Sequence, residues 1–297
     1  MTSASRASIE PEYLALLPGQ TIGRYEIVFF LREDPFGPSY RGRDCELGHD
    51  VIIEEFLPPA LAMRTDGINV LPRSPATAEA FRWGRRRFAD EARSLSRLRH
   101  VHFVPSIIDV VDANGTSYIV LDPVRGPTLE DHLREGRPFS RQEVGSFLQS
   151  LLEGLRQIHD AELLHCDVRP ANIVLDISCG PTLTHFGSAK AAMAGRMSPM
   201  ALPASDYTAP EQLTCDKLGP WTDIYNLAAT MYRVIVGHPP PTAIERIQAD
   251  KYRRLADLAP AGFTLGMLTA IDMGLSLRSA ERLQTVASWQ AMLPKAL

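Results

Sequence analysis

The spacing of hydrophobic residues divides the chain into a β-rich first part and a helical second part. Between residues 24 and 56, three segments rich in β-branched and aromatic residues, RYEIVFFL, PSYRGRD and DVIIEEF, alternate with turn-prone sequence, which predicts a three-stranded meander. Two more predicted strands, FVPSIIDVVDA and TSYIVLDPV, are joined by Asn114 and Gly115, a pair typical of tight hairpins. We therefore expect five strands before residue 127.

Helical periodicity appears on both sides of that point. After a Pro-rich connection through residue 76, one helix over residues 78–98 presents an apolar face with Glu91 beside it, formed by Phe88, Ala92, Leu95 and Leu98. Ser140 and Glu143 form a capping-box sequence ahead of a longer apolar stripe: Val144, Phe147, Leu148, Leu151, Leu155 and Ile158. Another helix begins near Asp223 and ends at Gly237. The sequence predicts an α+β chain with a flexible tail at 1–17, a β-rich lobe at 18–126 and a mainly helical lobe at 127–297.

Composition and charge narrow the classes of function. The chain has 297 residues, and 31 Lys and Arg against 35 Asp and Glu give a net charge of -4, which offers no general attraction to nucleic acid or an anionic membrane. No secretory leader and no apolar run of about 20 residues is visible. The 4 cysteines lack metal-ligand or disulfide spacing. We expect a cytoplasmic protein with reduced thiols.

Three short motifs follow one another in the second half of the chain. HCDVRPAN at 165–172, HFG at 185–187 and APE at 209–211 resemble the catalytic loop HRDxKPxN, the DFG motif and the APE motif of protein kinases. Their order and spacing, together with VIIEEF at 51–56 and Glu91, are similar to those of the bacterial Ser/Thr kinase-like group over about residues 24–293. The resemblance implies a bilobal protein kinase-like fold, with a five-stranded N-lobe carrying one main helix and a mainly helical C-lobe.

The resemblance also assigns roles in the C-lobe. Asp167 corresponds to the residue that accepts the proton of the substrate hydroxyl, Arg169 replaces a nearby lysine, and Asn172 corresponds to a magnesium ligand. Glu211 and Arg282 occupy the positions of a structural ion pair, and Asp223 that of an aspartate that caps the catalytic-loop backbone. This scaffold is intact.

Several nucleotide-binding positions depart from the family. Glu54 stands where a lysine contacts phosphates and pairs with the helix glutamate, here Glu91, and His185 stands where an aspartate binds magnesium. Imidazole is a poor ligand for a hard cation. Three glycines of the phosphate-binding loop are replaced, leaving Gly37; the replacing residues are Arg32, Asp34 and Pro35.

The adenine pocket is altered as well. Ile52 replaces an alanine that contacts the purine in the family, while Leu121 is the gatekeeper, and the Asp122 carbonyl and Val124 amide remain available at the hinge. Val174 completes the degenerate nucleotide site. We expect no resident cofactor: ATP binds weakly at most, and magnesium is not held.

Simpler interpretations stay open for several residues. His185 is an ordinary loop histidine, a metal ligand, or half of an ion pair with Glu54 that Glu91 also joins. Cys166 replaces an arginine that reads a phosphate on the activation segment, where Ser188, Ser198, Ser205 and Thr208 lie, and is a small buried residue rather than a reactive thiol. Asp167 and Asn172 could be purely structural. A basic cluster is a docking patch or a solvated helix start: Arg82, Arg85, Arg86 and Arg87.

The favoured hypothesis is a catalytically impaired pseudokinase that binds a protein partner or acts as an allosteric module in bacterial signalling. The alternative is an active, atypical Ser/Thr protein kinase, and a third hypothesis is a structural remnant without a partner. Neither nucleic acid nor membrane is expected among the partners.

Overall fold

The chain forms two compact units. The computed structural model describes residues 15–34, 36–98, 103–136, 139–176, 180–186, 205–214 and 216–293. Unit 1 comprises Met1–Arg86 and Asp109–Val120, and unit 2 comprises Arg87–Ile108 and Leu121–Leu297. The predicted tail and lobe boundaries stay predictions, since residues 1–14 lie outside the described part of the chain.

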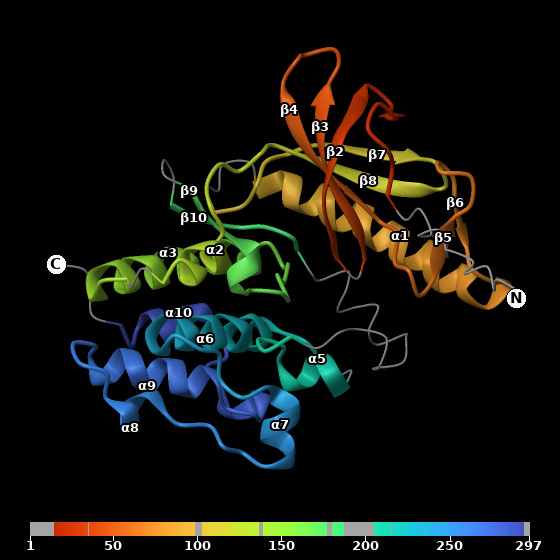
Figure 1. Ribbon diagram of the computed structural model, residues 1–297. Coiled ribbons are helices and arrows are strands. Elements are labelled where there is room, and N and C mark those ends of the chain that lie inside the picture. The colour runs from red at the N-terminus through yellow and green to blue at the C-terminus, as the bar shows by residue number, and fades with distance from the viewer. Residues whose placement is uncertain are drawn as a thin grey trace, which may run out of the picture. The chain divides into compact units, whose positions relative to one another are not determined.

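A six-stranded sheet organises unit 1 (Figure 1), in the order β1-β2-β3-β4-β8-β7. All five predicted strands are present, and a short sixth one, β1, precedes them. The strands are β1 (Thr21–Ile22), β2 (Tyr25–Asp34), β3 (Gly37–Asp44), β4 (Asp50–Glu55), β7 (Ile107–Ala113) and β8 (Thr116–Leu121). Antiparallel pairs such as Tyr40 with Ile53 fix the register of the meander. The turn at Asn114 (φ 52°) and Gly115 (φ 77°) is left-handed at both residues, as the Asn-Gly pair predicts.

The expectation of a plain Pro-rich connection through residue 76 is wrong. This stretch forms a small hairpin of β5 (Ala62–Arg64) and β6 (Val70–Pro72). Asp66 closes its turn by accepting hydrogen bonds from the Ile68 and Asn69 amides. Strands of three residues carry too little alternation of apolar and polar positions to stand out in the sequence.

A buried polar cluster joins this hairpin to the sheet. Arg64 Nη2 lies 2.6 Å from both carboxylate oxygens of Glu55, and both side chains are fully buried. Tyr40 and Tyr118 donate to the same carboxylate at 2.7 and 3.0 Å, and the amide of Leu16 donates to Tyr40. Burial opposes ionisation, yet the Glu55 carboxylate holds the pKa of Arg64 above its ordinary value. The cluster ties together β3, β4, β8, the hairpin and the chain entry.

The long helix α1 (Pro75–Leu95) continues from unit 1 into unit 2 and ends in a 3₁₀ turn, η1 (Ser96–Leu98). It begins earlier than the periodicity predicts. Ala92 and Leu95 are buried as expected, whereas Phe88 and Leu98 are half-buried, and Phe81 and Ala89 contribute to the buried face instead.

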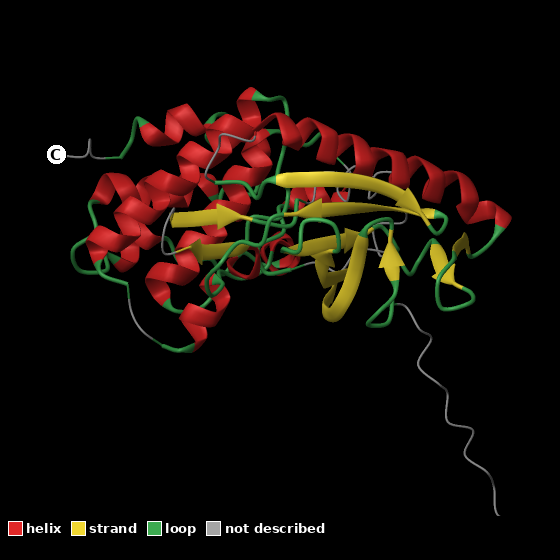
Figure 2. Cartoon of the chain, turned by 90° about the horizontal axis from the view of Figure 1, so that it is seen from above, coloured by secondary structure: helices red, strands yellow, loops and turns green. Residues whose placement is uncertain are grey.

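Unit 2 is mainly helical, as Figure 2 shows by colour, with one two-stranded ribbon. Its elements are α2 (Leu129–Arg134), α3 (Arg141–Asp160), η2 (Pro170–Asn172), β9 (Ile173–Asp176), β10 (Gly180–Leu183), α5 (Pro210–Thr214), α6 (Pro220–Val236), α7 (Ala243–Gln248), α8 (Leu255–Leu258), α9 (Leu265–Gly274), η4 (Ser279–Glu281) and α10 (Val286–Gln290). In Figure 1 α6 lies against α9, and the two helices are in contact.

The two predicted helices of this unit are confirmed. Ser140 Oγ accepts from the Glu143 amide while Glu143 accepts from the Ser140 amide, which is the predicted capping box at the start of α3. All six residues of the predicted apolar stripe are buried. The helix α6 ends at Gly237, whose φ of 92° is the left-handed conformation that favours glycine. Among the described residues, no helix is long and apolar enough to cross a bilayer.

Candidate functional site

The catalytic-loop motif of unit 2 is held by a buried aspartate of α6. Asp223 accepts hydrogen bonds from the amides of His165 and Cys166 at 2.9 and 2.6 Å, and His159 Nε2 lies 2.8 Å from it. Burial alone would raise the pKa of Asp223, but the hydrogen bonds with His159 and the amides hold that pKa below its ordinary value. Asp223 therefore remains ionised and fixes the loop, as the resemblance implied.

The three predicted catalytic residues lie together on this loop. Asn172 Nδ2 donates to Asp167 Oδ2 at 2.7 Å and to the Asp167 carbonyl at 3.0 Å. Arg169 Nε lies 3.2 Å from Asp167 Oδ1. Each carboxylate oxygen of Asp167 thus has a partner within the loop, and Asn172 is fully buried.

His185 directly follows Thr184, a residue that contacts this loop. Thr184 donates to the Asn172 carbonyl from its amide at 2.8 Å and from its hydroxyl at 3.1 Å. His185 itself has a φ of 59°, which is uncommon for a residue other than glycine. The ring of the next residue, Phe186, packs against that of His165 in a tilted arrangement, with centroids 4.6 Å apart. Burial lowers the pKa of His165.

The predicted hinge positions also belong to unit 2. Leu121 ends β8, and the Asp122 amide donates to the Ser106 carbonyl at 2.9 Å. Val124 is half-buried, and Val174 on β9 forms a bridge with Thr128.

The predicted phosphate-site residues Arg32 and Glu54 and the predicted adenine-pocket residue Ile52 lie on β2 and β4 of unit 1 and are half-buried. Arg32 and Glu54 are both opposite Ser39 of β3. The retained Gly37 has a φ of 139°, and a Cβ there would lie 2.2 Å from the Glu55 carbonyl oxygen, so this position requires glycine. Pro35 lies outside the described residues.

The predicted pair of Glu54 with His185, and the contribution of Glu91, stay predictions. Glu54 belongs to unit 1, whereas Glu91 and His185 belong to unit 2. Within the described part of the chain, no group of three or more His, Cys, Asp or Glu side chains is arranged to hold a metal ion.

Cys166 is a buried residue, which confirms the simpler interpretation of it. Burial, followed by the nearby carboxylates of Asp223 and Glu91, raises the pKa of its thiol well above the ordinary value. The reactive form, a thiolate, is therefore disfavoured at neutral pH.

The basic residues of α1 have local partners. Arg85 donates to the Gly115 carbonyl at 3.2 Å, and Arg86 donates to the Arg82 carbonyl at 3.4 Å. These contacts favour a solvated helix surface over a docking patch. Of the predicted phosphate acceptors, Ser205 and Thr208 hydrogen-bond one another, and Ser188 and Ser198 lie outside the described residues.

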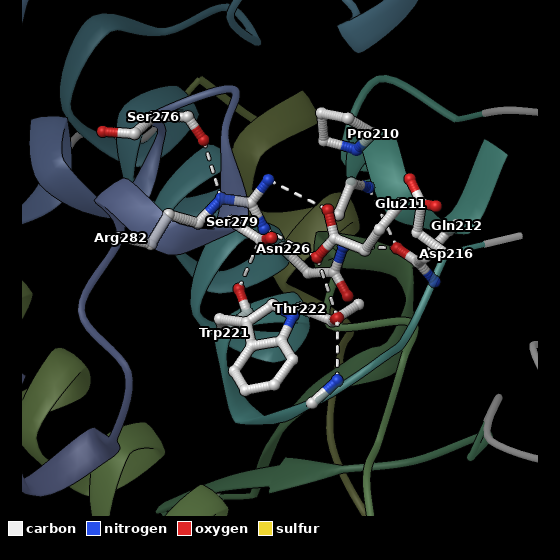
Figure 3. Close-up of polar contacts among 12 residues, drawn as sticks. Pro210, Glu211, Gln212, Asp216, Trp221, Thr222, Asn226, Ser276, Ser279 and Arg282 are labelled. Atoms are coloured by element: carbon white, nitrogen blue, oxygen red, sulfur yellow. Dashed lines mark hydrogen bonds and ion pairs between the residues drawn. The ribbon is translucent and has the colours of Figure 1, made fainter. Parts of the chain in front are cut away.

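The predicted ion pair of Glu211 and Arg282 is present (Figure 3), with N–O distances of 2.6 and 2.9 Å. Thr222 donates to Glu211, and Arg282 also donates to the carbonyl oxygens of Ser276, Leu277 and Trp221. The sequence analysis missed Gln212, which directly follows the APE motif and whose side chain donates to the Cys166 carbonyl at 2.7 Å. Its position beside the motif is the signal that could have identified it.

The comparisons with known proteins agree with this arrangement. A model described as the protein kinase domain matches residues 74–265, which is more than half of the chain. The chain belongs to the protein kinase domain family. A solved structure described as PpkA-294 in its apo form superposes with a TM-score of 0.79 and 30% identity, and the match covers 95% of this chain and 100% of that one. The predicted kinase-like fold is thereby confirmed.

The relatives are bacterial. The probable serine/threonine-protein kinase PknB of Corynebacterium glutamicum is 30% identical over 70% of this chain and 35% of its own length. The serine/threonine-protein kinase PknB of Mycobacterium tuberculosis is 26% identical over 93% of this chain and 43% of its own length. The predicted membership of a bacterial Ser/Thr kinase-like family is confirmed. The chain spans less than half the length of these relatives.

Proposed function

We propose that this member of the kinase family is a pseudokinase: a protein-binding or allosteric signalling module with weak or no nucleotide binding. One observation carries the proposal. At the two positions where the family places a phosphate-binding lysine and a magnesium-binding aspartate, this chain has Glu54 and His185.

Electrostatics supports the proposal on the unit 1 side. A nucleoside triphosphate is strongly anionic, and a carboxylate at a few ångströms from a phosphate costs several kcal/mol at an effective dielectric near 20. Glu54 places a carboxylate at the position of the family's phosphate-binding lysine, and Arg32 is opposite the same β3 residue, Ser39, on the neighbouring strand β2. The residues present do not fit a magnesium–triphosphate group, so no phosphoryl-transfer step is derived through it.

The geometry of unit 2 supports a binding role. The catalytic loop is fully assembled around Asp223, while both oxygens of Asp167 are engaged by Asn172 and Arg169. A loop whose backbone is fixed by a buried aspartate and whose Asn172 is hydrogen-bonded to Asp167 is held in one arrangement, as a binding module requires. We expect a protein partner, not nucleic acid or a membrane, and a cytoplasmic setting.

The test is a thermal shift of the chain with ATP, with and without magnesium, combined with transfer of labelled phosphate to a generic protein acceptor. A ligand at 100 times its dissociation constant would stabilise the fold by about 2.7 kcal/mol. We expect no magnesium-dependent shift and no transfer. A magnesium-dependent shift, together with transfer that is lost in Asp167→Ala, would establish an active atypical Ser/Thr kinase instead.

A further inference from the structure

The backbone of Cys166 is in an unfavourable conformation that its surroundings must maintain. Its φ of 61° is left-handed, and a residue with a Cβ keeps such a conformation only where neighbouring groups fix it. The Cys166 amide is fixed by Asp223 at 2.6 Å, and its carbonyl accepts from Gln212 Nε2 at 2.7 Å. Both the amide N–H and the carbonyl group of Cys166 are therefore hydrogen-bonded to side chains.

Gln212 connects this residue to the segment that ends in the APE motif. Gln212 Oε1 accepts from the Ala209 amide at 2.9 Å and from Asn226 Nδ2 at 3.0 Å. Asn226 Nδ2 also donates to the Tyr207 carbonyl at 2.7 Å. Two neutral amide side chains, Gln212 and Asn226, thus join residues 207–209 to the catalytic loop, and we name them the amide latch.

The charges around Cys166 are unsuited to a phosphate. Its amide donates to the Asp223 carboxylate, and, after burial, the carboxylates of Asp223, Glu91, Asp167 and Glu211 also raise the pKa of its thiol, so the charged side chains around it are acidic. The arginines described as partners of two of these carboxylates are engaged in those pairs, Arg169 with Asp167 and Arg282 with Glu211. A phosphoryl group brought to this point would meet repulsion rather than a free arginine.

We propose that Gln212 is a positioning residue that sets the catalytic loop in its folded arrangement without any phosphate on the preceding segment. The inference goes beyond the proposed function, because it concerns the order of the loop and holds whether or not a nucleotide binds.

Two substitutions at Gln212 distinguish the role of its side-chain N–H donor from that of its oxygen acceptor. Gln212→Met removes both, whereas Gln212→Glu keeps an oxygen for the Ala209 amide but removes the donor to the Cys166 carbonyl. The matched control is Gln157→Met, because Gln157 is also half-buried and donates at 2.7 Å, to Glu153 on α3.

The measurement is amide hydrogen exchange of the whole chain, with peptides covering residues 163–169, 205–209 and 148–158. Loss of one hydrogen bond predicts roughly fivefold faster exchange. We expect faster exchange at 163–169 in both Gln212 variants. At 205–209 we expect faster exchange only in Gln212→Met. In Gln157→Met, exchange should be unchanged in both of these peptides. In the Gln212 variants, exchange at 148–158 reports whether the fold persists. Unchanged exchange at 163–169 in both Gln212 variants would overturn the proposal.

A second measurement tests the independence from phosphate. Phosphoserine is incorporated at position 188 or 198 by codon suppression, and exchange at 163–169 is compared with that of the unmodified chain. We expect the same rates, because the amide latch already holds Cys166. A change in either direction would show that the loop responds to phosphorylation and would overturn this part of the proposal.

Discussion

The two units have kept different parts of what they inherited from the kinase family. In unit 1 the strands β2 and β4 carry Arg32, Ile52 and Glu54 at the predicted nucleotide-binding positions. In unit 2 the predicted catalytic loop has Asp167 and Asn172, and Asp223 of α6 supports it. The match to the family model begins at residue 74, after β2–β4. The difference is that the unit 1 positions depart from the family's residue types, whereas most of the unit 2 positions, with exceptions such as His185, retain them.

Each unit is nevertheless stabilised by a buried arginine–carboxylate pair of its own. Arg64 with Glu55 holds the hairpin of unit 1, and Arg282 with Glu211 holds α5 and the segment after α9 in unit 2. The two pairs differ in what remains if the arginine is lost. Glu55 would keep the hydroxyls of Tyr40 and Tyr118, while Glu211 would keep only that of Thr222 among the partners described.

The largest expected effect is the loss of stability when either arginine is replaced. Arg64→Met and Arg282→Met each leave a buried carboxylate unpaired, which costs about 3–5 kcal/mol of the free energy of unfolding. We expect Arg282→Met to lie at the upper end, because three carbonyl oxygens lose a donor as well. Urea denaturation measures both losses.

Arg278→Met is the control for that experiment, since Arg278 pairs with Glu281 at the surface with 83% of its side chain exposed. An exposed pair contributes at most about 1 kcal/mol. Equal losses in Arg64→Met and Arg278→Met would contradict a stabilising role for the buried pair of unit 1.

A second prediction restores the family's charges across the two units. The double variant Glu54→Lys with His185→Asp should gain a magnesium-dependent thermal shift with ATP, of up to about 2.7 kcal/mol at 100 times the dissociation constant. The physical reason is that an ammonium and a hard carboxylate ligand replace a carboxylate and an imidazole. Glu46→Lys combined with His185→Asp gives the same net charge change from an exposed turn of unit 1 and serves as the control. A shift of equal size in this control would show that position 54 is not responsible.

Much of the fold follows from local sequence signals, and the exceptions have physical causes. The capping box at Ser140, the turn at Asn114 and the stop at Gly237 were predictable because each depends on residues adjacent in the chain. The β5–β6 hairpin was not, because its strands have three residues each and its link to the sheet is the contact of Arg64 with Glu55, which no periodicity reveals.

In the candidate site, too, residues within motifs were predictable and residues with distant backbone partners were not. The motifs identified Asp167, Asn172, Asp223 and the pair of Glu211 with Arg282, since their types and spacing are characteristic. Gln212 directly follows the APE motif, and that position was its one sequence signal; its partner, the carbonyl of Cys166, is 46 residues away and is not visible in the sequence.

The smallest expected effect is a pH dependence that the two units should share. Hydrogen bonds from the Asn69 side chain and then from backbone amides lower the pKa of Asp66 in unit 1 to about 2, and hydrogen bonding from Arg156 lowers the pKa of Glu153 in unit 2 to about 2. A carboxylate with a pKa below its unfolded value, about 4, stabilises the fold above about pH 4, and this contribution disappears as the pH falls toward 2.

In urea denaturation, Asp66→Ala and Glu153→Ala should therefore be less stable than the unaltered chain at neutral pH, and their stability should converge with that of the unaltered chain in acid. Because both carboxylates lie at the surface, the differences should be small. A gap that stayed constant down to the lowest pH at which the chain folds would mean that these side chains act through packing and not through their charge.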